Sequence, residues 1–196
     1  ATRLDIGIAF GAVLLSSLLG TIIGGALGYF GGILDKTVSR IVDILMAFPL
    51  FVLAMAMVAA LGNTILNVVY ATAVINLPFY IRIARAEVSI RRHLGYVEAA
   101  QVGGSGDWRI LFVFLLPNIS QVIIIQASVN LGWAVLNAAG LSFLGLGIRP
   151  PTPEWGVMVA EGARFVGSGQ WWIAFFPGIA LMMTVFSSNF LRYCTW

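Results

Sequence analysis

The sequence has little charge, one cysteine and one histidine. Only eleven basic and eight acidic residues occur among 196, whereas a soluble domain carries charge on roughly a quarter of its residues. Cys194 has no second cysteine with which to form an intrachain disulfide, and His93 has no second histidine or cysteine cluster beside it. The low charge excludes an ordinary soluble enzyme, and neither a disulfide framework nor a structural metal site can be proposed.

The sequence is instead rich in apolar residues. They make up 60% of the chain, and the mean hydropathy is +0.96, as is typical of a protein whose surroundings are mostly lipid. The basic residues lie in short patches along the chain, a distribution that fits orientation in a bilayer better than a phosphate-binding face. We therefore expect an all-α, polytopic membrane helix bundle, in contact with membrane lipid and with no nucleic-acid partner.

Long uncharged stretches predict about five membrane spans within a single transmembrane domain, 1–196. Residues 6–30 carry no charge and, as a helix rising about 1.5 Å per residue, are long enough to cross a hydrocarbon core of about 30 Å. The uncharged stretch from Ile44 to Ile81 has room for two spans, with Gly62-Asn63 as the turn between them. The predicted spans are 6–30, 42–62, 63–81, 109–133 and 171–191.

The region after the fourth predicted span is less clear. Residues 134–148 fit either a re-entrant piece or a further span, and hydropathy does not choose between them. In the predicted outer loop, 149–170, several prolines end any helix, and Thr152 is a suitable N-cap for a short helix with Pro153 and Glu154 in its first turn. The apolar face of this helix predicts that it lies on the membrane surface. That face consists of Trp155, Met158, Val159, Gly162 and Phe165.

Small residues and prolines predict how the spans pack and bend. Gly20, Gly24 and Gly28 recur at every fourth position of the first span, so that one face of it exposes backbone to a closely packed neighbouring helix. Pro49 is expected to bend its helix. Asp43 is expected near the membrane interface, close to basic residues, rather than at membrane depth.

The most polar segment, 82–108, is expected on the cytoplasmic side by the positive-inside rule. It contains the sequence Tyr96-Val97-Glu98-Ala99-Ala100-Gln101-Val102-Gly103-Gly104, which predicts a short Ala-rich helix that carries one carboxylate and ends at two glycines. Such a segment has little side-chain bulk and could dock into a groove of a partner protein. A surface loop with helical character explains these residues about as well.

At this segment the sequence resembles the inner-membrane permease subunits of bacterial ATP-binding-cassette importers. The hallmark of that family corresponds here to Glu98-Ala99-Ala100, Gly104 and Phe114-Leu115-Leu116-Pro117, with phenylalanine in place of the usual isoleucine. The stretches 139–147 and 150–156 are similar to the dipeptide, oligopeptide and nickel branch, and to the second (C-type) of its two paired permeases. The family's usual first span is missing from the chain, and residues 191–196 lack the Gly-Asp that normally follows the last span, which indicates a truncated or altered end.

The resemblance implies a type I importer permease in the bacterial inner (plasma) membrane. It implies partners: a second homologous permease in a heterodimer, two ATP-binding subunits and an extracytoplasmic substrate-binding protein. No Gly-x-x-x-x-Gly-Lys-Ser/Thr motif occurs in the chain, so ATP and Mg are expected on the partner subunits, with no catalytic residue, cofactor or metal on this chain. The residues that the resemblance assigns to coupling with the ATPase are Tyr96, Glu98, Ala99, Ala100 and Gly104.

Polar residues within the fourth apolar stretch are candidates for the translocation pathway. Gln126, Asn130, Trp133 and Asn137 recur at helical spacing. Amides exposed to lipid are costly, so these residues must face protein or a water-filled cavity. Hydrogen bonding between helices explains them about as well as pathway lining.

The predicted function is therefore ATP-driven import of di- or oligopeptides, with this chain forming half of the pathway. Nickel chelates, glutathione and opine-like conjugates are alternative substrates within the same family. An ion-driven secondary transporter is the alternative outside it, although that class usually places ionisable residues at the midplane, and 44–81 and 110–148 contain none. A membrane anchor or assembly subunit without transport is a further alternative.

Overall fold

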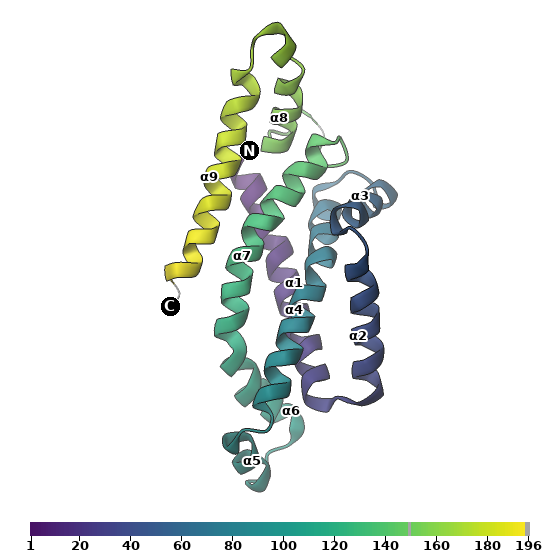
Figure 1. Cartoon of the computed structure of the whole chain (residues 1–196), viewed down its shortest axis with the longest axis vertical. Coiled ribbons are helices and arrows are strands. Elements are labelled where there is room, and N and C mark those ends of the chain that lie inside the picture. The colour runs from purple at the N-terminus through teal and green to yellow at the C-terminus, as the bar shows by residue number, and fades with distance from the viewer. Residues whose placement is uncertain (149, 195–196) are drawn as a thin grey trace. The chain divides into compact units, whose positions relative to one another are not determined.

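The computed structural model describes residues 1–148 and 150–194, with side chains as far as residue 190. Arg149 in the predicted outer loop and residues 195–196 lie outside the described residues, as does the side chain of Cys194. Every regular element of the described chain is helical, which confirms the all-α prediction (Figure 1). The elements are α1 (Thr2–Phe30), α2 (Gly32–Ala47), α3 (Leu50–Leu61), α4 (Ile65–Arg91), α5 (Gly95–Val102), α6 (Asp107–Arg109), the π-helix η1 (Ile110–Leu115), α7 (Leu116–Phe143), α8 (Trp155–Ala163), the 3-10 helix η2 (Val166–Ser168) and α9 (Trp172–Cys194).

Four helices of the described chain are long and apolar enough to cross a membrane, and a fifth span results if α2 and α3 count as one bent span. This agrees with the prediction of about five spans. The four helices are Thr2–Phe30, Ile65–Arg91, Asp107–Phe143 and Trp172–Phe190.

The chain forms two compact units. The first unit consists of residues 1–15, 49–75 and 127–196, and the second unit of residues 16–48 and 76–126. The division falls within α1, α4 and α7, so each of these helices contributes residues to both units.

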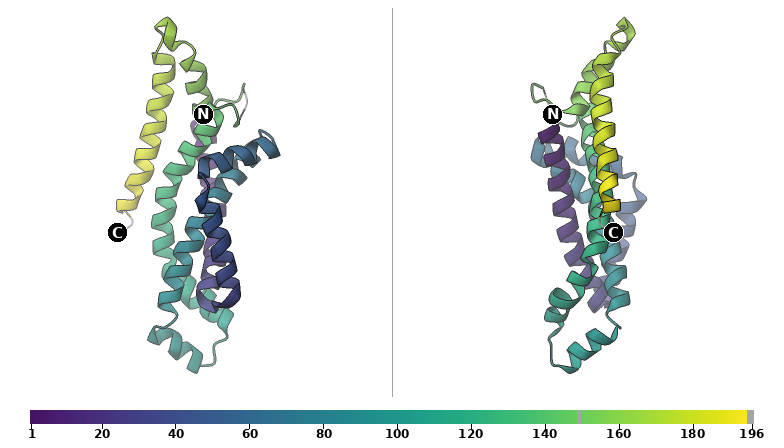
Figure 2. Two further views of the ribbon diagram at one scale, coloured as in Figure 1. Left: turned by 45° about the vertical axis from the view of Figure 1, so that its right-hand side comes forward. Right: turned by 90° about the vertical axis from the view of Figure 1, so that its left-hand side faces the viewer.

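The first unit buries mainly small and branched apolar side chains. One core cluster gathers residues of α1, α3, α4 and α7, and another includes Trp155 of α8 together with residues of α1 and α7. Helix α9 runs beside α8 (Figure 2). A Cβ on Gly162 would lie 2.5 Å from the backbone nitrogen of Ala174, so only glycine allows α8 to approach α9 this closely.

In the second unit, α1 and α4 pack closely along a glycine face, as predicted. A Cβ on Gly20 would lie 2.5 Å from Tyr80 Cβ, and one on Gly28 would lie 2.5 Å from the Arg85 carbonyl oxygen. Gly24 meets the backbone of Ile81 in the same way. Dispersion forces between close backbones stabilise such a contact even in lipid, where the hydrophobic effect contributes nothing.

The helix breaks inside the predicted span 42–62, at Pro49, where the sequence predicts a bend. The break separates α2 from α3 at Phe48 and Pro49. Proline disfavours a helical conformation in the preceding residue, and Phe48 is extended, with φ −79° and ψ 146°. The predicted turn at Gly62-Asn63 is confirmed, since α3 ends at Leu61 and Gly62 adopts a φ of +95°.

Two helices continue beyond the predicted spans. The predicted span 63–81 stops before the first arginine, whereas α4 continues through Pro78 to Arg91. Within this extension Arg82 and Arg85 form ion pairs with residues of α2. The first part of the segment 82–108, as far as Arg91, is therefore helical. Helix α7 extends beyond the predicted end at residue 133 to Phe143, so most of 134–148 continues the same helix and forms neither a separate span nor a re-entrant piece.

The short helix of the outer loop begins later than predicted. Glu154 is extended and acts as the N-cap, because its side chain accepts a hydrogen bond from Val157 N; Thr152 does not cap the helix. The predicted apolar face is also divided. Trp155 is buried in the core of the first unit, whereas Phe165 is exposed and follows the end of α8 at Ala163.

Candidate functional site

Helix α5 lies at one end of the second unit, between α4 and α6 (Figure 1). Its anchor is Val97, whose side chain is completely buried. Glu98 and Ala99 are exposed, and Val102 is 91% exposed. The helix thus has a single apolar anchor and an outer surface of small or short side chains.

The glycines predicted to end this helix do so by a specific backbone pattern. Gly104 N donates to Gln101 O, and Ser105 N donates to Ala100 O, each at 3.0 Å. These two bonds form a Schellman motif, in which the residue after the end of the helix adopts a left-handed backbone conformation. Gly104 supplies it, with a φ of +76°. The prediction of a short helix ended by two glycines is confirmed.

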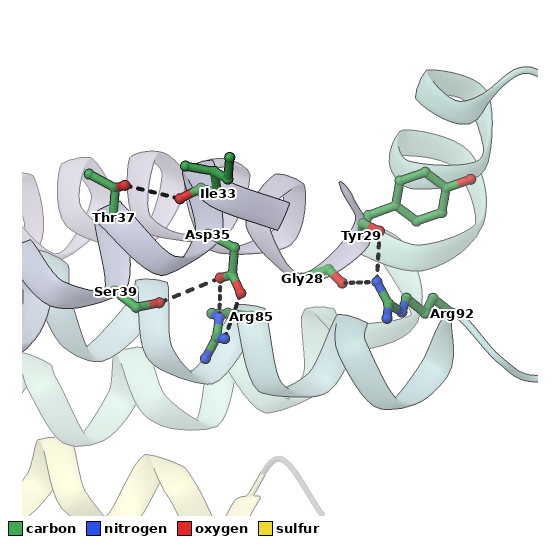
Figure 3. Close-up of polar contacts among 8 residues, drawn as sticks. All are labelled: Gly28, Tyr29, Ile33, Asp35, Thr37, Ser39, Arg85 and Arg92. Atoms are coloured by element: carbon green, nitrogen blue, oxygen red, sulfur yellow. Dashed lines mark hydrogen bonds and ion pairs between the residues drawn. The ribbon is translucent and has the colours of Figure 1, made fainter. Parts of the chain in front are cut away.

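The residues on either side of α5 are bonded to the end of α1. Arg92 Nη1, before α5, donates to the carbonyl oxygens of Gly28 at 3.3 Å and Tyr29 at 3.0 Å (Figure 3). These carbonyls lie in the last turn of α1, where intrahelical partners are lacking. After α5, Asp107 Oδ1 accepts a hydrogen bond of 2.7 Å from the Tyr29 hydroxyl. A displacement of α5 would therefore strain bonds to α1 at both of its ends.

A cleft of about 390 Å³ opens among these polar groups. It brings the predicted residue Glu98 together with side chains that sequence reasoning had not assigned to the site. Tyr29 is 78 positions from its partner Asp107, and no local pattern reports a contact at that separation. The lining residues are Tyr29, Phe30, Arg92, His93, Glu98, Gln101 and Asp107.

Two ion pairs fasten α2 to α4 within the same unit. Arg85 forms a bidentate pair with Asp35, in which Nη2 and Oδ2 are 2.7 Å apart (Figure 3). Arg82 Nη2 lies 2.6 Å from Asp43 Oδ1. The basic partner of Asp43 is thus on α4, and no pattern within α2 pointed to it. The bidentate pair is the more specific contact, since two nitrogens on one edge of the guanidinium group, Nε and Nη2, each bind a carboxylate oxygen.

The four candidate pathway residues all lie on α7, but they do not form one uniform stripe. Gln126 belongs to the second unit and the other three to the first. Asn130 is 5% exposed, whereas Trp133 is 61% exposed. Asn137 Nδ2 donates to the Trp133 carbonyl of its own helix at 3.0 Å, so this amide is satisfied without a bond to another helix.

Comparison with known proteins gives consistent results. Residues 6–194 match the family described as "Binding-protein-dependent transport system inner membrane component". The chain is 40% identical over 177 residues to the probable D,D-dipeptide transport system permease protein DdpC of Escherichia coli K12, a match that covers 90% of this chain and 59% of that protein. It is 38% identical over 190 residues to the glutathione transport system permease protein GsiD of Pectobacterium atrosepticum, covering 97% of this chain and 63% of that protein.

The fold is also found among solved structures. A chain of the MetNI methionine ABC transporter in an inward-facing conformation superposes with a TM-score of 0.76, at 19% sequence identity, and the match covers 100% of this chain and 94% of that one. At this identity the likeness concerns the fold alone. The chain spans about three-fifths of the length of the curated relatives it matches.

Proposed function

Because this chain belongs to the family of binding-protein-dependent transport system inner membrane components, we propose that it is the membrane-spanning subunit of an ATP-driven importer and forms half of the pathway for di- or oligopeptides. It is a multi-pass inner membrane protein, and its described residues contain four apolar helices long enough to cross the membrane, or five spans if α2 and α3 count as one. Relatives named for dipeptide and glutathione transport support a peptide substrate, since glutathione is itself a modified tripeptide.

The observation that carries the proposal is the form of α5. Its fixed anchor, Val97, and its exposed surface around Glu98 and Ala99 suit insertion into a groove of a separate protein. We assign that groove to an ATP-binding subunit, which would hold ATP and Mg. The other partners in the proposal are a second permease and an extracytoplasmic substrate-binding protein.

The bonds around α5 provide a route by which its movement would reach the membrane. Helix α5 follows α4 after a short turn and precedes the continuous helix from Asp107 to Phe143. Arg92 and Asp107 also bind the end of α1. When ATP draws the two ATP-binding subunits together, a shift of α5 would therefore displace three long helices together. Side chains of α7, including Asn130 and Asn137 with Gln126 and Trp133, are the proposed lining of the pathway.

The proposal is tested with the complete transporter, its partner subunits and its binding protein reconstituted in liposomes. Uptake of labelled dipeptide and ATP hydrolysis are measured together. We expect uptake only with ATP, and hydrolysis stimulated by the loaded binding protein. Uptake driven by a proton gradient without ATP would identify a secondary transporter, whereas a stable complex with no uptake under either condition would identify an assembly subunit.

Two substitutions in the α5 segment give a sharper test. Glu98→Lys should lower dipeptide uptake about tenfold or more, because the carboxylate could no longer accept a hydrogen bond from the proposed ATP-binding subunit. Losing a hydrogen bond to a charged group costs about 1.5–3 kcal/mol, and 1.4 kcal/mol is a factor of ten. Gly104→Val should act similarly, since a β-branched residue is strained at a φ of +76°. Both variants should remain in the membrane at normal levels.

The matched control is Gly106→Ala. Gly106 lies two residues from Gly104 and has equally open surroundings, but its φ is −70°, which alanine adopts without strain. Uptake by this control should be unchanged. Normal uptake by the Glu98→Lys variant at normal expression would refute the assignment of α5 to coupling.

A further inference from the structure

Two carboxyl groups in the first unit are buried together and have no part in the proposed coupling. Asp5 lies in the first turn of α1, and Glu154 is the N-cap of α8. Each residue is only 1% exposed. Aspartate and glutamate are almost never buried to this extent unless they are paired.

Each carboxyl group uses one oxygen to hold the start of α8. Asp5 Oδ2 accepts a hydrogen bond from Trp155 N at 3.3 Å, and Glu154 Oε2 accepts one from Val157 N at 3.0 Å. The other oxygens, Asp5 Oδ1 and Glu154 Oε1, are buried and receive no hydrogen bond from the described chain. Trp155, whose backbone nitrogen Asp5 binds, directly follows Glu154 in the chain, so the two carboxyl groups are neighbours at the start of α8.

This arrangement is not stable with both groups ionised. A buried carboxylate without compensation loses its hydration, and a second negative charge in contact adds repulsion. Glu154 is the acidic group that acts on Asp5, and the adjoining core cluster contributes the apolar side chains of Ala9, Val13 and Trp155. One proton on the pair removes one of the two negative charges. It also provides a hydrogen-bond donor, which two ionised carboxylates do not have.

We propose that Asp5 and Glu154 form a proton-binding site in which one proton is shared between the two carboxyl groups and fastens the N-terminus of α8 to the first turn of α1. The inference does not depend on the proposed function, because it rests on the burial and contacts of this pair alone. Without the proton, two like charges would face each other, and the first turn of α8 would separate from α1.

The direction of the pH dependence follows from proton linkage. In the proposed closed pair one proton is held, whereas separated aspartate and glutamate side chains in water, with ordinary pKa values of about 3.9 and 4.3, hold none at neutral pH. Above these ordinary values opening of α8 releases a proton, and its equilibrium constant should rise about tenfold for each pH unit as long as the closed form keeps that proton. The attachment of α8 is thus strongest at acidic pH, weakens as the pH rises, and stops changing once the closed pair has itself lost the proton.

The test uses the full-length permease in its assembled transporter, in lipid nanodiscs. Infrared spectroscopy at pH 7 reports the carbonyl stretch of a buried protonated carboxyl group. Hydrogen exchange of the segment 150–165 between pH 6 and pH 9, corrected for the intrinsic pH dependence of exchange, reports the opening of α8. We expect a protonated-carboxyl band in the wild type, and an opening that increases about tenfold per pH unit over the pH values at which this band persists.

Asp5→Asn replaces the shared proton by an amide donor of nearly the same shape. This variant should lose the infrared band and open to the same extent at every pH, and Glu154→Gln should behave alike. The matched control is Glu161→Gln, because Glu161 is an exposed acid of the same helix; it should keep both wild-type signals. If one of these two variants fails to fold, the other still tests the proposal.

Three results would overturn the inference. The first is the absence of a protonated-carboxyl band from the wild type at pH 7. The second is a band that persists in both the Asp5→Asn and the Glu154→Gln variants. The third is loss of α8 protection on adding a chelator at constant pH, which would show that a divalent cation, not a proton, lies between the two groups.

Discussion

Three glycines determine how closely α1 approaches α4 in the second unit. At Gly20, Gly24 and Gly28 a Cβ would overlap side-chain or backbone atoms of α4. Where the obstructing atom is backbone, a rotamer change cannot relieve the overlap, and one of the helices must shift. The cost of such overpacking is typically about 1–3 kcal/mol.

We therefore expect Gly24→Leu to lower the stability of the permease by about 1–3 kcal/mol, because Gly24 faces the backbone of Ile81. The measurement is the thermal unfolding midpoint of the purified transporter. Gly7→Ala on the same helix is the control, since a Cβ there has no atom within 4 Å; it should leave the midpoint unchanged or raise it, because alanine favours helix over glycine. Equal effects of the two substitutions would contradict close packing at Gly24.

Among the elements, α5 differs from the long helices in having one buried anchor and polar bonds at both ends. Arg92 binds backbone carbonyls of α1, and Tyr29 of α1 binds Asp107. Arginine suits the contact with two carbonyl oxygens because its guanidinium group offers several donors in a fixed plane. The two contacts link the predicted coupling segment to a helix far from it in sequence.

Removing the hydroxyl in Tyr29→Phe should weaken this link with little change in packing. We expect uptake per ATP hydrolysed to fall about fivefold, equivalent to about 1 kcal/mol for one hydrogen bond, while the basal rate of ATP hydrolysis stays unchanged. Asp107→Asn should give a smaller decrease, because its amide oxygen can still accept the bond. Tyr70→Phe, at an exposed tyrosine of α4, is the control. A fall in uptake that merely follows reduced expression would contradict a role in coupling.

At the scale of the whole molecule, Asn130 is the candidate pathway residue best suited to a test. It is a buried amide in a helix that is otherwise largely apolar. If α7 lines the pathway as proposed, Asn130→Leu should reduce the uptake of some peptides several-fold more than that of others, measured in competition with a panel of dipeptides. Leu136→Met, at an exposed position of the same helix, should change none of these ratios. A uniform loss of uptake, or failure to assemble, would indicate a packing role instead.

The sequence predicted local features well, because their causes are local. The lengths of the uncharged stretches predicted the number of spans. The spacing of Gly20, Gly24 and Gly28 predicted a closely packed face, and the glycines after α5 predicted its end. Span boundaries were less successful. The predicted span 63–81 stops before Arg82, whereas α4 continues to Arg91. Arg82 pairs with Asp43 on α2, and hydropathy contains no information about a partner 39 positions away.

By itself, then, the sequence determined the membrane class and the helical content, since these follow from composition, periodicity and the steric limits of glycine and proline. The family followed from the resemblance of the motif around Glu98 and Gly104 to a known one. Tertiary structure alone decided which polar groups meet. Arg92 reaches the end of α1 and Tyr29 reaches Asp107, while Asp5 and Glu154 come together from distant segments. Such contacts depend on how helices pack across long separations in sequence, and that packing places partners where no local pattern indicates them.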